Sequence, residues 1–212
     1  MEVTIEKALE LAVNAHSIGK LEEAEYFYKI VLQKHPTHQF TLKVLGDIFK
    51  QTGRIHEALI ARQKTVELDP SDFEAYYNLA NTLNELGRLE EAEKNYRKAI
   101  KLKPEFVLAH CNMGVVLKGS GKLKEAEDSF RKVISLDSNF TDAYTNLGNT
   151  LTELNKLEEA EVEYKKSLSL NPDSAETHNS LGITLQELGK LKKAVDSFKK
   201  AIDLKPSFTS AI

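Results

Sequence analysis

The sequence predicts an all-α fold, an α-solenoid of antiparallel helix pairs, on three observations. The chain of 212 residues repeats itself with a period of 34 residues. Each repeat contains two stretches with the apolar spacing of an amphipathic helix. A glycine or asparagine separates the two stretches, and a proline or serine follows the second. A fixed period of this length is typical of stacked repeats, which share no single central core.

Small residues and turn residues carry the period. An alanine recurs in every repeat, at Ala24, Ala58, Ala92, Ala126, Ala160 and Ala194. We predict that these structural alanines set how closely the two helices of a pair approach, because a larger side chain there would overpack. Prolines recur near the end of the repeat, at Pro36, Pro70, Pro104, Pro172 and Pro206, and Ser138 fills the one gap.

The period divides the chain into six repeats, which we interpret as a single repeat domain over residues 1–212. The repeats cover residues 5–38, 39–72, 73–106, 107–140, 141–174 and 175–208. Residues 209–212 parallel the opening of a repeat, so we expect the truncated start of a seventh repeat there. The apolar residues of the last repeat would then be partly exposed at the end of the array.

The third repeat shows how each first helix is delimited. Apolar residues spaced three and four apart predict a helix over residues 73–86. Ser71 and Glu74, three residues apart, predict a capping box at its start. Gly87 is expected to end the helix in the left-handed conformation, and Asn155 takes its place in the fifth repeat.

The second helix of that repeat is predicted over residues 89–102. Pro104 prevents its continuation. Helices of this length are marginal alone, so they depend on packing against their neighbours. Aromatic rings fill the space beside the repeated alanine in most repeats. The second repeat carries Arg62 there instead, and we expect its stem to pack while its charged head reaches water.

Composition excludes several classes of function. The chain has 29 Lys plus Arg and 32 Asp plus Glu, a net charge of −3, which disfavours nucleic acid as a partner. No apolar run approaches the ~20 residues needed to span a bilayer. Cys111 is the single cysteine, and the first residues lack the pattern of a signal peptide. A soluble, cytoplasmic protein is therefore expected, with no membrane partner.

No catalytic, cofactor-binding or metal-binding constellation is present in the sequence, so we predict no enzyme activity and no cofactor. The glycines are single and serve as helix stops rather than as a phosphate-binding loop. His35 and His38 lie close together but lack the further ligands of a metal site. We interpret Cys111 as a buried, inert thiol.

The repeat pattern resembles that of the tetratricopeptide repeat family. The fifth repeat carries the pattern at Tyr144, Leu147, Gly148, Leu151, Ala160, Tyr164 and Pro172. The resemblance covers residues 5–208. It implies a right-handed superhelix in which the first helices line a concave groove and the second helices form the convex back. It also implies that the groove binds protein or peptide partners.

Asparagines recur on the stripe of the first helices that would face this groove. Asn78, Asn112 and Asn146 lie one repeat apart, with Asn81 and Asn149 beside them. A carboxamide offers both an acceptor and donors, so it suits a peptide backbone of any sequence. This series resembles the asparagine ladder in the repeat arm of O-linked N-acetylglucosamine transferase. The alternative is that asparagine is simply a polar residue on an exposed helix face.

The same stripe is rich in carboxylates, which favours a neutral or basic partner over an acidic one. Its acidic members are Glu6, Glu10, Asp47, Glu74, Glu85, Asp142, Glu153, Glu176 and Glu187. Lys43 and Asn78 match two of the five residues with which chaperone-binding relatives of the family clamp a carboxylate. The other three positions do not match, so a chaperone-tail receptor is disfavoured.

A small apolar patch is expected near the N-terminal end of the groove. It is formed by Phe40, Val44, Val13 and Leu9. The patch would either seat an apolar side chain of a ligand or support the first repeats, since modest exposed apolar surface is ordinary.

Three functions fit these observations. The first is a non-catalytic protein–protein interaction module, or scaffold, that binds an extended peptide or partner segment in its groove. The second is a substrate-docking arm of a larger enzyme, such as a glycosyltransferase or methyltransferase, truncated after residue 212. The third is a scaffold that self-associates through its C-terminal hairpin.

Overall fold

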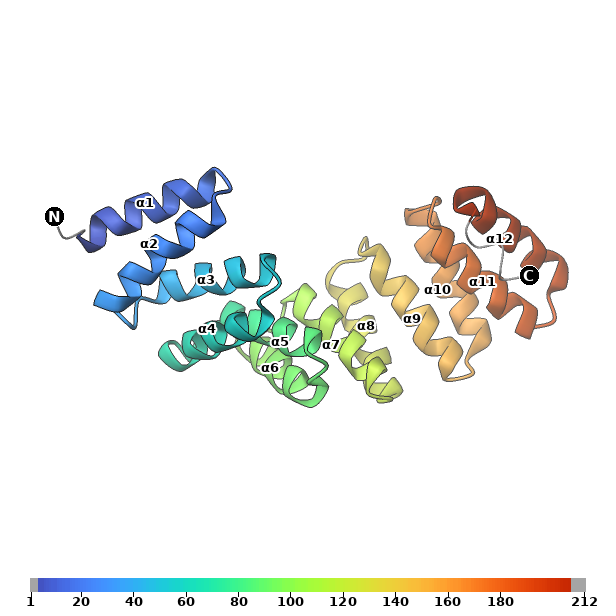
Figure 1. Cartoon of the computed structure of the whole chain (residues 1–212). Coiled ribbons are helices and arrows are strands. Elements are labelled where there is room, and N and C mark those ends of the chain that lie inside the picture. The colour runs from blue at the N-terminus through green and yellow to red at the C-terminus, as the bar shows by residue number, and fades with distance from the viewer. Residues whose placement is uncertain (1–3, 207–212) are drawn as a thin grey trace. The chain divides into compact units, whose positions relative to one another are not determined.

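The computed structural model describes residues 4–206, and this part of the chain consists of α-helices joined by short turns, without β-strands. The helices are α1 (Ile5–Ser17), α2 (Leu21–Lys34), α3 (Gln39–Gln51), α4 (Ile55–Leu68), α5 (Phe73–Glu85), α6 (Leu89–Leu102), α7 (Val107–Gly119), α8 (Leu123–Leu136), α9 (Thr141–Glu153), α10 (Leu157–Leu170), α11 (Ala175–Glu187) and α12 (Leu191–Leu204). Each predicted repeat holds one helix pair (Figure 1), which confirms the predicted all-α solenoid class. The expected seventh repeat at residues 209–212 lies outside the described residues.

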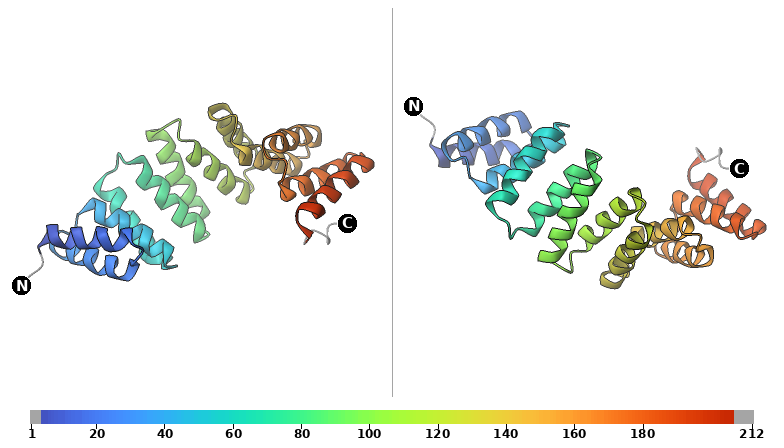
Figure 2. Two further views of the ribbon diagram at one scale, coloured as in Figure 1. Left: turned by 90° about the horizontal axis from the view of Figure 1, so that it is seen from above. Right: turned by 90° about the horizontal axis from the view of Figure 1, so that it is seen from below.

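The helices form two compact units, Met1–Pro104 and Glu105–Ile212. Within each unit, every helix contacts its partner in the pair, and the second helix of a pair contacts the first helix of the next (Figure 2). In the second unit the first helices also touch one another, α7 against α9 and α9 against α11. These three helices therefore form one continuous face. A single domain that includes both units remains a prediction.

The turn inside each repeat has the predicted geometry. Gly87 has a φ of 71° and Asn155 a φ of 58°, so both adopt the left-handed conformation. The amide of Arg88 donates to the carbonyl of Leu83 at 2.8 Å, and the amide of Gly87 donates to that of Asn84 at 2.9 Å. These two bonds satisfy carbonyls that the end of the helix would otherwise leave unpaired.

The N-cap of α5 is Asp72, so the predicted capping box of Ser71 and Glu74 is wrong. The Asp72 carboxylate accepts hydrogen bonds from the amides of Glu74 at 3.0 Å and Ala75 at 3.1 Å. Ser71 is engaged elsewhere, because its amide and hydroxyl both donate to the Asp69 side chain, at 3.0 and 2.6 Å. The helix still begins where the spacing predicted, at Phe73.

The two helices of a pair meet at small residues on both sides. The six structural alanines are at most 2% exposed. In the fourth, fifth and sixth repeats a glycine of the first helix lies opposite the aromatic ring of the second helix, whereas the first and third repeats carry Ala12 and Ala80 at that position. A Cβ on Gly148 would stand 2.6 Å from the Tyr164 ring, and one on Gly114 would stand 2.7 Å from the Phe130 ring. In the repeats that carry glycine, the ring occupies the space that a Cβ would need.

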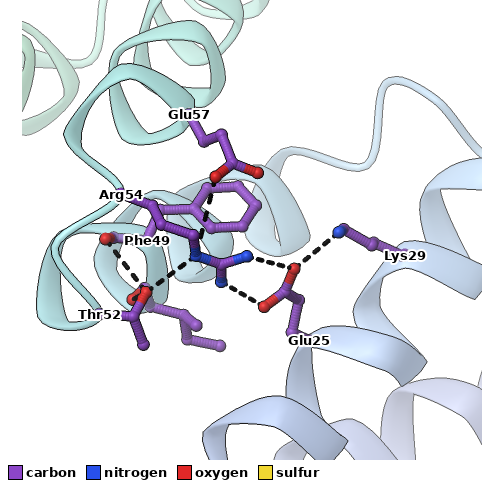
Figure 3. A network of polar contacts seen from close by, with 7 residues as sticks. Glu25, Lys29, Phe49, Thr52, Arg54 and Glu57 are labelled. Atoms are coloured by element: carbon purple, nitrogen blue, oxygen red, sulfur yellow. Dashed lines mark hydrogen bonds and ion pairs between the residues drawn. The ribbon is translucent and has the colours of Figure 1, made fainter.

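Buried carboxylates join successive repeats. Glu25 on α2 accepts hydrogen bonds from Arg54, in the turn of the second repeat (Figure 3). Glu25 also forms an ion pair with Lys29 on its own helix, at 2.6 Å. The hydrogen bond from Arg54 is the main cause that lowers the pKa of Glu25 to about 2. The Arg54 guanidinium also lies over the Phe49 ring, 4.6 Å from its centroid. Glu127 and Glu161 accept from the second unit's equivalent lysines, Lys156 and Lys190.

Candidate functional site

In the first unit, a hollow of about 160 Å³ lies between the second and third repeats. It is lined by Lys43, Asp47, Arg62, Thr65, Glu74, Ala75 and Asn78. The structure thus brings together Lys43 and Asn78, which the sequence singled out as binding residues. Both side chains are half-buried.

Lys43 already has a partner inside the protein. Its ammonium forms an ion pair with Asp72, whose side chain is 10% exposed and also caps α5. A ligand carboxylate would have to compete with this internal carboxylate for Lys43. The pair therefore argues against the use of Lys43 in a carboxylate clamp, in agreement with the mismatched clamp positions.

The head of Arg62 does not reach water, so that expectation is wrong. Arg62 is 5% exposed and donates to the Asp47 carboxylate and to the carbonyl of Asn78, both at 2.9 Å. It also donates to the Thr82 hydroxyl. A Cβ on Gly46 would lie 3.2 Å from Cγ of Arg62, so the absent side chain leaves room for its stem. The guanidinium stays inside because three acceptors meet it there.

The second unit carries a longer groove across its first helices. Two hollows, of about 350 and 300 Å³, share Asn149 and Ser180 and so adjoin each other. The larger is lined by Asp142, Thr145, Asn146, Asn149, Ser174, Glu176, Thr177 and Ser180. The smaller is lined by Lys118, Asn149, Thr152, Glu153, Tyr164, Ser180 and Ile183. The lining residues come mainly from α9 and α11, with Lys118 from α7.

Asn149 is held at the junction of these hollows by a buried tyrosine. The Tyr164 hydroxyl donates to Oδ1 of Asn149 at 2.8 Å, and Tyr96 donates to Oδ1 of Asn81 at 2.6 Å. Burial raises the pKa of Tyr164, so its hydroxyl stays protonated and remains a donor at neutral pH. Because the carboxamide oxygen of Asn149 accepts this hydrogen bond, the amide nitrogen is the group that Asn149 can present to a ligand.

The predicted asparagine ladder is divided between the two units. Asn78 lies in the first unit on α5, while Asn112 and Asn146 lie in the second on α7 and α9, which contact each other. All three side chains are half-buried, and Asn146 lines the larger hollow. A ligand role for the ladder remains a prediction.

Cations offset part of the acidic stripe. Lys118 donates to Glu153 at 3.1 Å, and Lys50 pairs with Glu85 at 3.6 Å. The sequence reasoning missed these lysines, because each lies on its helix one position before the stripe and reaches the next repeat. Asp142 and Glu176 line the larger hollow, and Glu176 forms a long ion pair with Lys205 at 3.8 Å.

The apolar patch of the first unit is partly surface and partly core. Phe40 and Val13 are 50% and 45% exposed. Leu9 and Val44 are half-buried and pack against the core of the first two repeats. The Phe40 ring lies edge-on to Tyr28, with centroids 6.4 Å apart. Leu9 and Val44 therefore support the repeats, while Phe40 and Val13 offer apolar surface.

The remaining reactive side chains have structural surroundings. Nδ1 of His38 accepts from the amide of Thr41 at 3.3 Å, so His38 caps α3, and the His35 ring lies edge-on to it. Across residues 4–206, no group of three or more His, Cys, Asp or Glu is arranged to hold a metal ion. Cys111 is buried, and burial raises its thiol pKa to about 11. None of the helices over this range is both long and apolar enough to cross a bilayer.

Some residues of the groove were not predicted. Thr145, Ser174 and Thr177 form a hydroxyl network at the floor of the larger hollow, with oxygens 2.8 to 3.1 Å apart. Tyr164 was interpreted only as a core ring. The signal for its second role was available in the sequence, since Tyr164 and Asn149 occupy fixed places in the same repeat.

Profiles of one repeat family match most of the chain. A profile described as TPR repeat matches residues 80–121 and 148–189. Three further profiles are described as tetratricopeptide repeat. One matches residues 63–94 and 129–162, the second matches residues 175–208, and the third matches residues 107–140. Together these matches extend from residue 63 to residue 208.

Solved structures share the fold at low sequence identity. A tetratricopeptide repeat protein from Parabacteroides merdae is 20% identical, with a TM-score of 0.82 over 98% of this chain and 86% of that chain. MamA from Desulfovibrio magneticus is 24% identical, with a TM-score of 0.76 over 80% of this chain and 96% of that chain. YrrB, described as a TPR protein with an unusual peptide-binding site, is 23% identical, with a TM-score of 0.74 over 87% and 95%.

A curated relative matches over a shorter stretch. The Protein CTR9 homolog of Arabidopsis thaliana is 33% identical over 66 residues, which is 31% of this chain and 6% of that protein. The chain thus aligns with a small part of a much longer protein.

Proposed function

The chain belongs to the tetratricopeptide repeat family, and we propose that it is a non-catalytic interaction module whose first helices bind an extended segment of a partner protein. The observation that carries this proposal is the pair of adjoining hollows over α9 and α11, in which Asn146 and Asn149 lie among hydroxyl groups. The description of YrrB as a protein with a peptide-binding site supports it by analogy.

The groove chemistry suits a peptide backbone. Carboxamides and hydroxyls can both donate and accept, so they can pair with main-chain amides and carbonyls without regard to the side chains of the peptide. Neighbouring helices lie about 10 Å apart and an extended peptide rises about 3.3 Å per residue, so successive repeats would meet every third residue of the ligand.

The charge at the groove favours a neutral or basic segment. Asp142 and Glu176 line the larger hollow, whereas the lysine of the smaller hollow, Lys118, already pairs with Glu153. An acidic ligand would meet the two carboxylates, while a basic side chain of a ligand would be attracted to them.

Selection from a library of random 12-residue peptides displayed on phage tests this function. The intact chain should enrich binders, and their capture should fall when Asn146→Ala and Asn149→Ala are combined. The matched control combines Lys166→Ala and Lys200→Ala, exposed residues of the second helices, and should leave capture unchanged. A chain that enriches no peptide, or equal capture by the asparagine variant, would contradict the proposal.

Self-association is a second candidate function, favoured by the outer face of the last helix pair. Leu191 is 62% exposed, whereas its equivalents in the other five repeats are half-buried. Val195 beside it is 49% exposed. Light scattering over a concentration series should then show a mass that rises with concentration and returns to the monomer value in Leu191→Glu. A monomer at all concentrations would remove this candidate.

A further inference from the structure

One residue of the groove and one residue of the core are chemically matched in almost every repeat. The groove position is the ninth residue of the repeat: Val13, Asp47, Asn81, Val115, Asn149 and Ile183. The core position is the twenty-fourth: Tyr28, Arg62, Tyr96, Phe130, Tyr164 and Phe198. Four repeats carry Tyr or Arg, a hydrogen-bond donor, at the core position, and three of these four carry Asp or Asn, an acceptor, at the groove position. The two repeats with Phe at the core position carry an aliphatic residue at the groove position.

The contacts show what the matching does. Tyr164 donates to Asn149 at 2.8 Å and Tyr96 to Asn81 at 2.6 Å. Arg62 donates to Asp47 at 2.9 Å. In the fourth and sixth repeats, the ring without a hydroxyl accompanies Val115 and Ile183. The first repeat is the exception, since Tyr28 accompanies Val13.

Burial explains why the two positions agree in the third and fifth repeats. Tyr164 and Tyr96 are at most 1% exposed, and a buried hydroxyl requires a hydrogen-bond partner. The groove position supplies such a partner in both repeats. In these repeats the core tyrosine thereby favours a polar residue at the groove position and sets the orientation of its carboxamide.

In the second unit this produces an ordered surface on three contacting helices. Val115 on α7 is 40% exposed, Asn149 on α9 is half-buried and held by Tyr164, and Ile183 on α11 is 42% exposed and lines the smaller hollow. From α7 to α11 the surface therefore presents an apolar side chain, an amide donor and a second apolar side chain, one from each repeat.

We propose that this surface selects extended segments with two apolar side chains about six residues apart and a main-chain carbonyl midway between them. The apolar side chains would lie against Val115 and Ile183, and the carbonyl would accept from the Asn149 amide. The spacing follows from two steps of about 10 Å between helices and about 3.3 Å per extended residue. This inference rests on the proposed function, and it makes Tyr164 a positioning residue that acts through Asn149.

The sequences of the selected 12-residue peptides test it. Peptides enriched by the wild-type chain should carry apolar residues at i and i+6, with no apolar preference at i+2 or i+4, the central residues that share their face. The exchange variant Asn149→Val with Tyr164→Phe reproduces the pair of the fourth repeat. It should therefore fold, and it should add an apolar preference at i+2 or i+4.

Tyr164→Phe alone tests the positioning role, because the ring stays and only the hydroxyl is lost, which also lies 3.3 Å from Oγ1 of Thr152. Binding of a selected peptide should weaken about three- to tenfold, the effect of one hydrogen bond. Tyr26→Phe makes the same change on the second helix α2, where Tyr26 is 62% exposed, and should not alter this binding. Adding Asn149→Val to Tyr164→Phe should weaken it no further for a peptide with an apolar residue at i+2 or i+4.

The outcomes separate this inference from the proposed function. No enriched peptide would overturn both. Enriched peptides without the i and i+6 spacing, or the same preferences in the exchange variant, would overturn this inference and leave the interaction module standing. Should the exchange variant lose its helical circular dichroism, an unchanged affinity in Tyr164→Phe would still overturn it.

Discussion

Arg54 donates to both carboxylate oxygens of Glu25 and so ties the turn of the second repeat to the second helix of the first (Figure 3). The Glu25 side chain is 12% exposed, which keeps water from competing strongly for the carboxylate. In the second unit, Lys156 donates to Glu127 and Lys190 donates to Glu161 in the same way. Junctions between repeats thus rest partly on charge, in addition to apolar packing.

Acid should weaken these junctions. The pKa of Glu25 is lowered from 4.5 to about 2, chiefly by Arg54, and Lys165 and Lys190 lower the pKa of Glu161. A carboxyl whose pKa is lower in the folded state stabilises the fold above its unfolded pKa, and the effect is lost as pH falls to the folded value. Denaturation followed by circular dichroism should therefore show a free energy of unfolding that declines between about pH 4.5 and 2.

Glu25→Gln provides the control for this prediction. It should destabilise the chain by roughly 1–3 kcal/mol at pH 7, because Arg54 loses a charged partner. It should also show a smaller decline in acid than the wild-type chain. An equally steep decline in Glu25→Gln would contradict a role for Glu25 in the acid sensitivity.

Gly148→Ala should destabilise the fifth repeat. The new Cβ would stand 2.6 Å from the Tyr164 ring, which is buried and cannot move aside. Overpacking of this kind costs about 1–3 kcal/mol, against a gain of about 1 kcal/mol in helix propensity. Urea unfolding should show a lower midpoint. Gly46→Ala is the matched comparison, since its Cβ meets the flexible Arg62 stem at 3.2 Å, and it should cost less than Gly148→Ala.

Tyr164 and Asn149 should be coupled in stability. Tyr164→Phe removes the donor of the 2.8 Å hydrogen bond, and Asn149→Ala removes its acceptor. In a double-mutant cycle the two changes should be non-additive by about 0.5–1.5 kcal/mol, the contribution of one hydrogen bond. Additive effects would show that this hydrogen bond does not form in solution.

The Cys111 thiol should be unreactive in the folded chain. Burial, with a smaller effect of Asp142, raises its pKa to about 11, so the reactive thiolate is scarce at pH 8. Modification by a disulfide reagent should be slow in buffer and fast in denaturant. Equal rates in both conditions would mean that α7 opens freely.

The 34-residue period was sufficient to predict the helix pairs, their turns and the buried alanines. These features depend on local spacing and on left-handed residues such as Gly87 and Asn155. Side-chain partners across helices were harder to predict. The buried head of Arg62 and the reach of Lys118 to Glu153 each depend on the distance between two elements, which helical periodicity does not encode. The Asp72 cap is local, but Ser71 and Asp72 are both residue types that favour an N-cap, so the sequence did not distinguish between them.

The central claim, that the asparagines of the first helices bind a partner segment, is tested most directly by affinity. Fluorescence anisotropy of a labelled peptide selected on the intact chain would compare an asparagine variant with a lysine variant. Combining Asn112→Ala and Asn146→Ala, on contacting helices of the second unit, should weaken binding at least about tenfold, the equivalent of 1.4 kcal/mol, with the helical signal intact. Combining Lys132→Ala, Lys166→Ala and Lys200→Ala on the second helices should leave it unchanged. Equal affinity in the asparagine variant and the wild-type chain would contradict the claim.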